Sequence, residues 1–291
     1  MARPAGINAW AMPRVSVREA ARIAARAGFD VLEPNLVEDG ELGLDTSQQS
    51  ARELRSAVES EGVRVGGLSS GLYWKYSPTS DDKATREKAR EIAVQQLEMA
   101  SELGAGAVLI VPGQVGRAMG GPTVRYDTAY ERATEFIAGL APVAESVGVD
   151  IGVENVWNKF LLSPVEMRQF VDEIGSPRVG VYFDVGNILL YGYPEHWLEV
   201  LGPRVRRVHL KDFRRSSGTP GEFCDIGDGD VDWEEVGVAL DSAGYQGPLT
   251  AEVSPTGQEQ ADLQGYIDRI HGQVRGVMAR MQTSARGEAV D

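Results

Sequence analysis

Four ionisable side chains in the second half of the chain each follow a short apolar run, at or near the point where a strand is predicted to end. A charge beside core-forming residues is costly unless it is paired. Three carboxylates and an imidazole suit a hard divalent cation, whose charge would relieve their mutual repulsion. The pattern therefore predicts a site for one divalent metal ion. The residues are Glu154 in GVEN, Asp184 in VYFDVGN, His209 in RVHLKD and Glu252 in LTAEV.

The chemistry of these side chains also narrows the choice of ion. A thiolate zinc site is excluded because the chain holds a single cysteine, Cys224. Mn²⁺ is favoured, with Mg²⁺ or Co²⁺ as alternatives. Any one of the four residues alone could equally cap a helix, bind an arginine or lie hydrogen-bonded in the core. The prediction depends on their recurrence on four consecutive strands, whereas His196 and His271 fall in helical patterns and are interpreted as structural or surface residues.

Short β-branched apolar runs alternate with longer amphipathic stretches along most of the chain. Stretches such as 17–28, 84–104 and 130–148 consist mainly of good helix formers. Several stretches end on a glycine, which accepts the left-handed conformation that stops a helix; these are Gly28, Gly62, Gly104, Gly148, Gly175 and Gly202. Eight strands are predicted, over residues 5–10, 31–36, 64–70, 107–113, 150–156, 179–186, 205–213 and 248–254.

This alternation predicts the fold. Strands and helices joined by short turns imply parallel strands with right-handed crossovers, and eight such units match a closed (β/α)₈ TIM barrel. An open doubly wound sheet is the rival, but no glycine-rich dinucleotide loop follows the first strand. We predict one barrel domain over residues 1–282 and a polar tail over 283–291. In a barrel the loops after the strands converge, so the four ionisable residues should meet.

Composition limits the partners. The formal net charge of −14 would repel nucleic-acid phosphates, so a nucleic-acid partner is not expected. The chain contains no unbroken run of about 18 apolar residues, the length that a membrane span requires. Its first residues lack the apolar core of a secretory signal. A lone cysteine fits a reducing compartment. We therefore expect a cytoplasmic protein that acts on a small molecule.

Around these residues, the sequence resembles the xylose-isomerase-like TIM-barrel sugar isomerases and epimerases. It is most similar to the branch of L-ribulose- and L-xylulose-5-phosphate 3-epimerases and ketose 3-epimerases. The resemblance covers nearly the whole chain, from about Gly6 to Glu252, and VYFDVGN followed by VHLKD is fairly specific to the superfamily, though not to one activity. The matching stretches are RVGGLSSGLYWKYSPTSDDKATREKA, GVEN, VYFDVGN, VHLKDF and EFCDIGDGDVDW leading to AEV.

The resemblance implies a sugar or polyol substrate and a mechanism. Glu154, Asp184, His209 and Glu252 would be the metal ligands, and the two glutamates would also form an acid/base pair on opposite faces of the substrate. The metal would polarise the ketone and hydroxyl oxygens, which lowers the cost of an enediolate. One carboxylate would remove the proton at C3 and the other would deliver a proton from the far side. Family members often form dimers or tetramers, so a homo-oligomer is expected.

Asn187 marks a departure within the family. Tagatose-type epimerases carry a histidine at this position, three residues after the metal aspartate, whereas the pentulose-5-phosphate 3-epimerases carry asparagine. Asn187 could donate a hydrogen bond to a substrate hydroxyl but cannot be charged.

Three more polar residues near strand ends are candidates for the site. Glu33 ends the second predicted strand and could orient the substrate or hydrogen-bond His209. Asn155, directly after Glu154, could play a similar part. Lys211 could bind substrate oxygens or form a structural pair with an aspartate.

Loop residues complete the predicted site. Arg214 or Arg215 could reach a substrate oxygen or phosphate, or could be a solvated loop arginine. Trp74, like Trp10 and Trp157, follows a predicted strand, where aromatic faces often line sugar pockets; each could instead pack between loops. The mixed segment 73–82 could form a lid over the pocket.

The acidic run DIGDGDVDW (225–233) lacks the closing glutamate of a calcium loop. Asp232 as the N-cap of a helix that begins at Trp233, with Glu235 at the third position, explains it better.

The favoured function is a metal-dependent 3-epimerase acting on a ketose or ketose phosphate. A lyase on the same scaffold, such as an inosose or keto-polyol dehydratase, remains the alternative because both reactions begin by removing a proton next to a carbonyl. A hydroxypyruvate-type aldose–ketose isomerase and a non-catalytic sugar-binding protein are less favoured. A DNA-repair endonuclease of this superfamily would need many histidines and a basic groove, and the chain has three histidines and a charge of −14.

Overall fold

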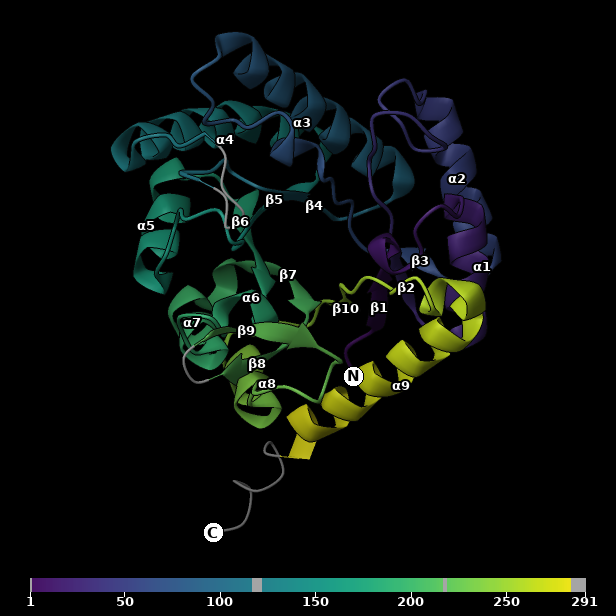
Figure 1. Cartoon of the computed structure of the whole chain (residues 1–291). Coiled ribbons are helices and arrows are strands. Elements are labelled where there is room, and N and C mark those ends of the chain that lie inside the picture. The colour runs from purple at the N-terminus through teal and green to yellow at the C-terminus, as the bar shows by residue number, and fades with distance from the viewer. Residues whose placement is uncertain (1, 117–121, 217–218, 284–291) are drawn as a thin grey trace.

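Eight parallel strands form the central sheet of the structure, a computed structural model that describes residues 2–116, 122–216 and 219–283. The strands follow the order β3-β2-β1-β10-β7-β6-β5-β4, and helices surround them (Figure 1). The strands of this sheet are β1 (Ala5–Asn8), β2 (Val31–Glu33), β3 (Arg64–Val65), β4 (Ala107–Ile110), β5 (Asp150–Glu154), β6 (Val179–Asp184), β7 (Val205–Leu210) and β10 (Leu249–Ala251).

The two end strands, β3 and β4, meet through the residues that follow β3. The Leu68 N–H donates to the Ala107 carbonyl at 3.0 Å, and the Leu68 carbonyl accepts the Leu109 N–H at 3.0 Å. The chain can pass this close to the interior because residue 67 is glycine: a Cβ on Gly67 would lie 2.6 Å from the Tyr182 hydroxyl. These bonds close the ring and confirm the predicted (β/α)₈ barrel.

Helices follow the strands, and their ends match the predicted signals. All six predicted helix-ending glycines have a positive φ, for example 95° at Gly28 and 74° at Gly104. At the other end of α1, the Ser16 side chain accepts the Glu19 N–H at 3.1 Å. The α-helices are α1 (Val17–Ala27), α2 (Gln48–Ser60), α3 (Lys83–Leu103), α4 (Tyr126–Val147), α5 (Pro164–Ile174), α6 (Val185–Ile188), α7 (Pro194–Leu201), α8 (Trp233–Ser242) and α9 (Leu263–Thr283). The 3₁₀ turns are η1 (Ala9–Ala11), η2 (Leu72–Trp74), η3 (Gly202–Arg204) and η4 (Glu259–Asp262).

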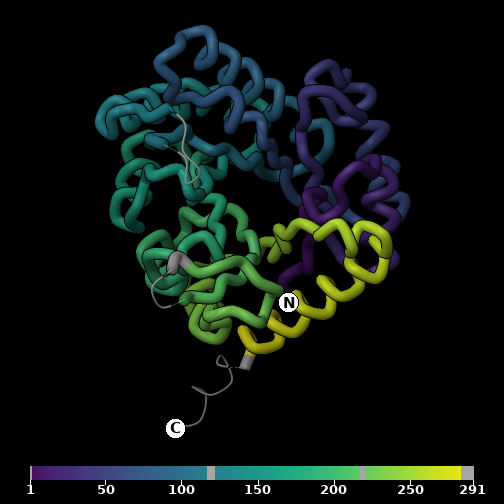
Figure 2. The backbone as a smooth tube through the Cα atoms, in the orientation of Figure 1, coloured from purple at the N-terminus to yellow at the C-terminus, as the bar shows by residue number. Residues whose placement is uncertain are grey.

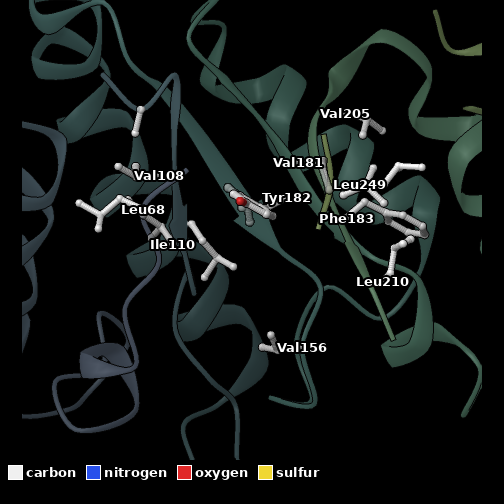
Figure 3. Packing of buried hydrophobic residues seen from close by; sticks show 14 of the residues in the cluster. Leu68, Val108, Ile110, Val156, Val181, Tyr182, Phe183, Val205, Leu210 and Leu249 are labelled. Atoms are coloured by element: carbon white, nitrogen blue, oxygen red, sulfur yellow. The ribbon is translucent and has the colours of Figure 1, made fainter. Parts of the chain in front are cut away.

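Strand β6 shows how side chains alternate between the barrel interior and the helices. Phe183 faces the helices and lies against Trp197 of α7, with 6.4 Å between ring centroids. Tyr182 lies on the opposite side of β6 from Val181 and Phe183 (Figure 3). Asp184 has the same parity as Tyr182, so it belongs to the interior at the carboxyl end of the barrel.

The seventh strand is shorter than predicted. The sequence pattern predicted a strand over 205–213, but β7 ends at Leu210, and after Lys211 the chain leaves the barrel. Strand β8 (Asp212–Ser216) pairs antiparallel with β9 (Thr219–Cys224) outside the main sheet. The reason lies in Asp212, which is 1% exposed and turns to the loop that precedes α8 instead of continuing the ladder.

The last helix brings the two ends of the barrel together. Helix α9 packs against α1 and α8, and β1 pairs with β10, so the N-terminal and C-terminal parts of the tube lie side by side (Figure 2). Apart from Thr283, the predicted polar tail over 283–291 lies outside the described residues. No described helix is long and apolar enough to cross a membrane.

Replacing Asp212 with alanine should destabilise the protein strongly. Its carboxylate accepts the N–H groups of Phe213, Gly227 and Val231 at 2.9, 2.9 and 3.3 Å, and the Trp233 Nε1–H at 3.2 Å. Losing this acceptor leaves buried donors unsatisfied, so Asp212→Ala should lower the free energy of unfolding by about 3 kcal/mol, measured by urea denaturation.

A matched control lies in the same loop. Among the described residues, the Asp232 side chain accepts one N–H, that of Glu235 at 3.1 Å, as the N-cap of α8. Asp232→Ala should therefore cost about 1 kcal/mol. Equal losses for the two variants would contradict the assigned role of Asp212.

Candidate metal and proton-transfer site

The four predicted ligands meet at the carboxyl end of the barrel. Glu154 and Asp184 are the last residues of β5 and β6, His209 lies opposite Asp184 in β7, and Glu252 directly follows β10. One ligand atom from each residue lies within 4.8 Å of the others. His209 Nδ1 is 2.9 Å from Glu252 Oε2 and 3.9 Å from Glu154 Oε1. The cluster could therefore hold one metal ion, as predicted.

Three atoms of the cluster are buried without a partner in hydrogen-bond geometry: Asp184 Oδ2, His209 Nδ1 and Glu252 Oε2. Buried polar atoms in native proteins nearly always have a partner, because losing their hydration is costly. Two carboxylate oxygens and an imidazole nitrogen placed in this way can coordinate a divalent cation. The donor set thus fits a bound metal.

Glu33 holds the other side of the His209 ring. Its Oε1 lies 2.8 Å from His209 Nε2 and accepts the Asn8 Nδ2–H at 2.7 Å, and its Oε2 accepts the Tyr182 hydroxyl. Burial alone would raise the pKa of Glu33, but the charge and hydrogen bond of His209, with Tyr182 and Asn8, lower it below its usual range. With Nε2 engaged by Glu33, the ring presents Nδ1 to the cluster. Of the two predicted roles of Glu33, the structure shows the bond to His209.

The two glutamates of the cluster differ electrostatically. Burial raises the pKa of Glu154 to about 7, and the nearby charge of Glu252 adds to that effect. Burial would also raise the pKa of Glu252, but the positive charges of Lys211 and His209 outweigh it and lower the pKa below its usual range. Near neutral pH, Glu154 can therefore carry a proton while Glu252 is ionised. Such a separation suits a pair that exchanges acid and base roles.

Glu252 contributes to the lining of two cavities. The first, of about 430 Å³, is lined by Glu154, Glu252 and mostly uncharged residues, which are Trp10, Ser69, Ser70, Gly71, Trp74, Leu109, Val111 and Ser254. The second, of about 480 Å³, also contacts Glu252 and Lys211 and extends to Phe223 and Tyr266. Trp74 is thus placed at a cavity, as predicted. Thr79 in the predicted lid segment 73–82 is fully buried, with its hydroxyl on the Gln114 carbonyl at 2.7 Å, so that part is anchored.

The two asparagines position the strand ends. Asn155 Nδ2 donates to the Asp184 carbonyl at 2.8 Å, and its Oδ1 accepts the Asp184 N–H at 2.9 Å. Asn187 Nδ2 donates to the Asn155 carbonyl at 3.0 Å, and its N–H donates to Asp184 Oδ1 at 2.8 Å. These bonds orient Asp184 within the cluster. Contact of Asn155 or Asn187 with a substrate stays a prediction.

Arg215 is not brought to the cluster. Its Nε and Nη2 donate to the Leu189 and Gly192 carbonyls at 3.0 and 2.8 Å, and its guanidinium lies 5.0 Å from the Tyr193 ring centroid. Arg214 donates to the Asp228 carbonyl at 2.8 Å. Neither arginine lines the two cavities, because the chain turns outward after Lys211. The geometry does not support the predicted substrate contact of Arg215.

For Lys211 and Trp157 the structure shows the structural alternatives, namely a pair with an aspartate and packing between loops. Lys211 Nζ lies 2.8 Å from Asp184 Oδ2 and 2.6 Å from Glu252 Oε2, so it pairs within the cluster and not with Asp212. Trp157 stacks on Phe223, with ring centroids 4.9 Å apart.

Sequence reasoning missed Asn8 and Tyr182, which both hold Glu33. Asn8 also donates to Ser69 Oγ at 2.9 Å. A signal for Asn8 exists, since it is a polar residue within the first predicted strand, and in the structure it ends β1 as Glu33 ends β2. Tyr182 has no such signal, because within VYFDVGN it is indistinguishable from a core aromatic.

Replacing Glu33 with glutamine should weaken metal binding. The amide of glutamine can donate to His209 Nε2, which would favour the tautomer with a proton on Nδ1 and block that ligand. We expect Glu33→Gln to weaken Mn²⁺ binding by about 10- to 100-fold in isothermal titration calorimetry. Glu59→Gln, which alters a surface ion pair with Arg55, is the control. An unchanged affinity in Glu33→Gln would show that Glu33 does not set the ring.

Metal affinity should depend on pH through Glu154. Because its pKa is raised to about 7, protons compete with the cation below that value. Mn²⁺ affinity should fall by about tenfold per pH unit below pH 7 and level off above it, with proton uptake or release seen in buffers of different ionisation enthalpy. Glu154→Gln should bind less tightly but lose this step. A flat profile from pH 5.5 to 8 in the wild type would contradict the assignment.

The comparisons with known proteins place the chain in a family. A family model described as "Xylose isomerase-like TIM barrel" matches residues 21–270. The putative L-ribulose-5-phosphate 3-epimerase SgbU of Escherichia coli (strain K12) is 29% identical over 245 residues, covering 79% of this chain and 81% of that protein. The L-ribulose-5-phosphate 3-epimerase UlaE of Salmonella paratyphi A is 26% identical over 264 residues, covering 86% and 87%.

A solved structure of an L-ribulose 3-epimerase has a TM-score of 0.80 at 18% identity, covering 100% of this chain and 99% of that chain. At this identity the likeness supports the fold. The family model spans the strands that carry Glu33, Glu154, Asp184, His209 and Glu252, which is most of the barrel. The chain belongs to the xylose isomerase-like TIM barrel family.

Proposed function

We propose that this protein is a metal-dependent 3-epimerase of a ketose. The observation that carries the proposal is the pairing of Glu154 and Glu252 in one cluster, at the edge of a cavity that both residues line. An epimerase needs one group that removes a proton and one that returns it to the other face. The relatives named as L-ribulose-5-phosphate 3-epimerases support this reaction class.

The two glutamates of the cluster would transfer the protons. Glu252 would take the proton from C3, and Glu154 would deliver a proton from the opposite face; the roles exchange for the other epimer. A divalent ion held by the four ligands, Mn²⁺ in our proposal, would supply electrostatic stabilisation of the negative charge that develops on the substrate oxygens. Glu33 would keep His209 oriented throughout.

The lining favours a ketose without phosphate. Among the described residues of the 430 Å³ cavity there is no lysine or arginine; the polar groups are the two glutamates and the hydroxyls of Ser69, Ser70 and Ser254. Hydroxyls and the faces of Trp10 and Trp74 suit a neutral polyol, whereas a phosphate dianion is usually bound by cations or helix N-termini.

The lyase alternative lacks support from the comparisons, since the relatives named above are all 3-epimerases. The expected dimer or tetramer and the cytoplasmic location stay predictions.

Hydrogen exchange at C3 tests the reaction. In heavy water, the Mn²⁺-loaded protein should incorporate deuterium at C3 of ketoses such as L-ribulose, detected by NMR together with the second epimer. Glu252→Gln should lower the rate by about 10²- to 10⁴-fold, because it removes one proton-transfer group. The unphosphorylated ketose should give a higher kcat/KM than its 5-phosphate.

Two controls make the result interpretable. Glu59→Gln should exchange at the wild-type rate, and the metal content of each variant separates a lost base from a lost ligand. The epimerase proposal would be wrong if the Mn²⁺-loaded protein exchanged no C3 hydrogen of any ketose, or if it released water from the substrate.

A further inference from the structure

Lys211 lies within the cluster, but the proposed proton transfer gives it no role beyond its charge. Its Nζ lies 2.8 Å from Asp184 Oδ2 and 2.6 Å from Glu252 Oε2, and its side chain is only 21% exposed. Both oxygens are buried, and neither has a partner in hydrogen-bond geometry. The ammonium thus holds two of the metal-ligand carboxylates mainly by its charge.

The fold builds Lys211 into this position. A Cβ on Gly186 would lie 2.5 Å from the Lys211 Cβ, so α6 packs directly on the lysine stem. The ammonium lies 5.9 Å from the Phe223 ring centroid on β9. The neighbouring Asp212 does not compete for it, because its carboxylate accepts N–H groups of the loop before α8. The stem is held while the ammonium end lies at the wall of the 480 Å³ cavity.

A divalent cation and the ammonium would compete for these oxygens. Metal–oxygen distances in such sites are about 2.0–2.6 Å, so a metal on Asp184 Oδ2 and Glu252 Oε2 would lie near a second positive charge already within 3 Å of both. Like charges this close in a poorly hydrated site repel strongly. Metal binding therefore favours displacement of the ammonium, and the adjoining cavity gives it room.

We propose that Lys211 is an internal counter-ion of the metal site. Before the metal binds, its ammonium neutralises Asp184 and Glu252; when the metal binds, the ammonium is released into the 480 Å³ cavity. The inference rests on the metal site of the proposed function. Its consequence is that Lys211 lowers metal affinity.

Lys211→Met tests the competition, because methionine keeps much of the stem and removes the charge. In calorimetric titrations of the chelator-stripped full chain at pH 8, Lys211→Met should bind Mn²⁺ about tenfold more tightly than the wild type, because no cation has to be displaced. The Tm of the metal-free variant should be lower, since its carboxylates lose their counter-charge. Lys75→Met is the control, as Lys75 pairs with Glu38 on the surface at 2.6 Å, and should leave Mn²⁺ affinity unchanged.

Lysine labelling of the wild type tests the release without any substitution. Acetylation followed by mass spectrometry should modify Lys211 several-fold faster in the Mn²⁺-loaded protein than in the metal-free protein. Lys83 and Lys88, exposed on α3 with 80% and 42% of their side chains accessible, should react equally in both.

The outcomes separate the two proposals. Unchanged or weaker Mn²⁺ affinity in Lys211→Met, or equal labelling of Lys211 with and without Mn²⁺, overturns the counter-ion role and leaves the epimerase proposal standing. If Lys211→Met does not fold, the labelling of the wild type decides. A wild type that binds none of Mn²⁺, Mg²⁺ and Co²⁺ overturns the metal site itself, and the counter-ion role with it.

Discussion

Repulsion among buried carboxylates is the constraint on which this end of the barrel depends. Glu154, Asp184 and Glu252 contribute ligand atoms within 4.8 Å of one another, where little water screens their charges. The protein relieves this repulsion by placing His209 and Lys211 among them and by raising the pKa of Glu154. The negative charge that remains would favour binding of a divalent cation, so the cost to stability and the capacity for chemistry would have one cause.

Side chains in the interior of the barrel hold the His209 side of the cluster in place. A barrel of this kind is ordinarily filled by apolar side chains, but here Tyr182, Glu33 and Asn8 form a buried polar network that ends at His209. Gly67 leaves room for it, since a Cβ there would meet both Tyr182 and Glu33. Three separate strands thus orient one imidazole ring, which keeps its free nitrogen directed at the metal site.

The loops after the strands form much of the cavity wall beside the cluster. The barrel and the cluster are features that suit many sugar substrates, whereas the cavity wall comes from loop residues such as Ser70, Trp74 and Ser254. Arg215 of β8 is used for structure, because its guanidinium holds the turn between α6 and α7. In the proposed function, substrate choice would depend on the residues of the cavity wall more than on the barrel.

The amino-acid sequence by itself determined the eight strands, the glycines that end helices, the Asp232 cap and the four residues of the cluster. These features depend on residues close together in the chain or on their position relative to a strand end. Only the tertiary structure decided their partners. Glu33 and His209 are 176 positions apart, and nothing in local spacing distinguishes that bond from a substrate contact. For the same reason the sequence does not show that Lys211 contacts Asp184 while the adjacent Asp212 turns to the loop before α8. Strand register and the outward turn after β7 set the side-chain directions, and both depend on contacts between distant segments.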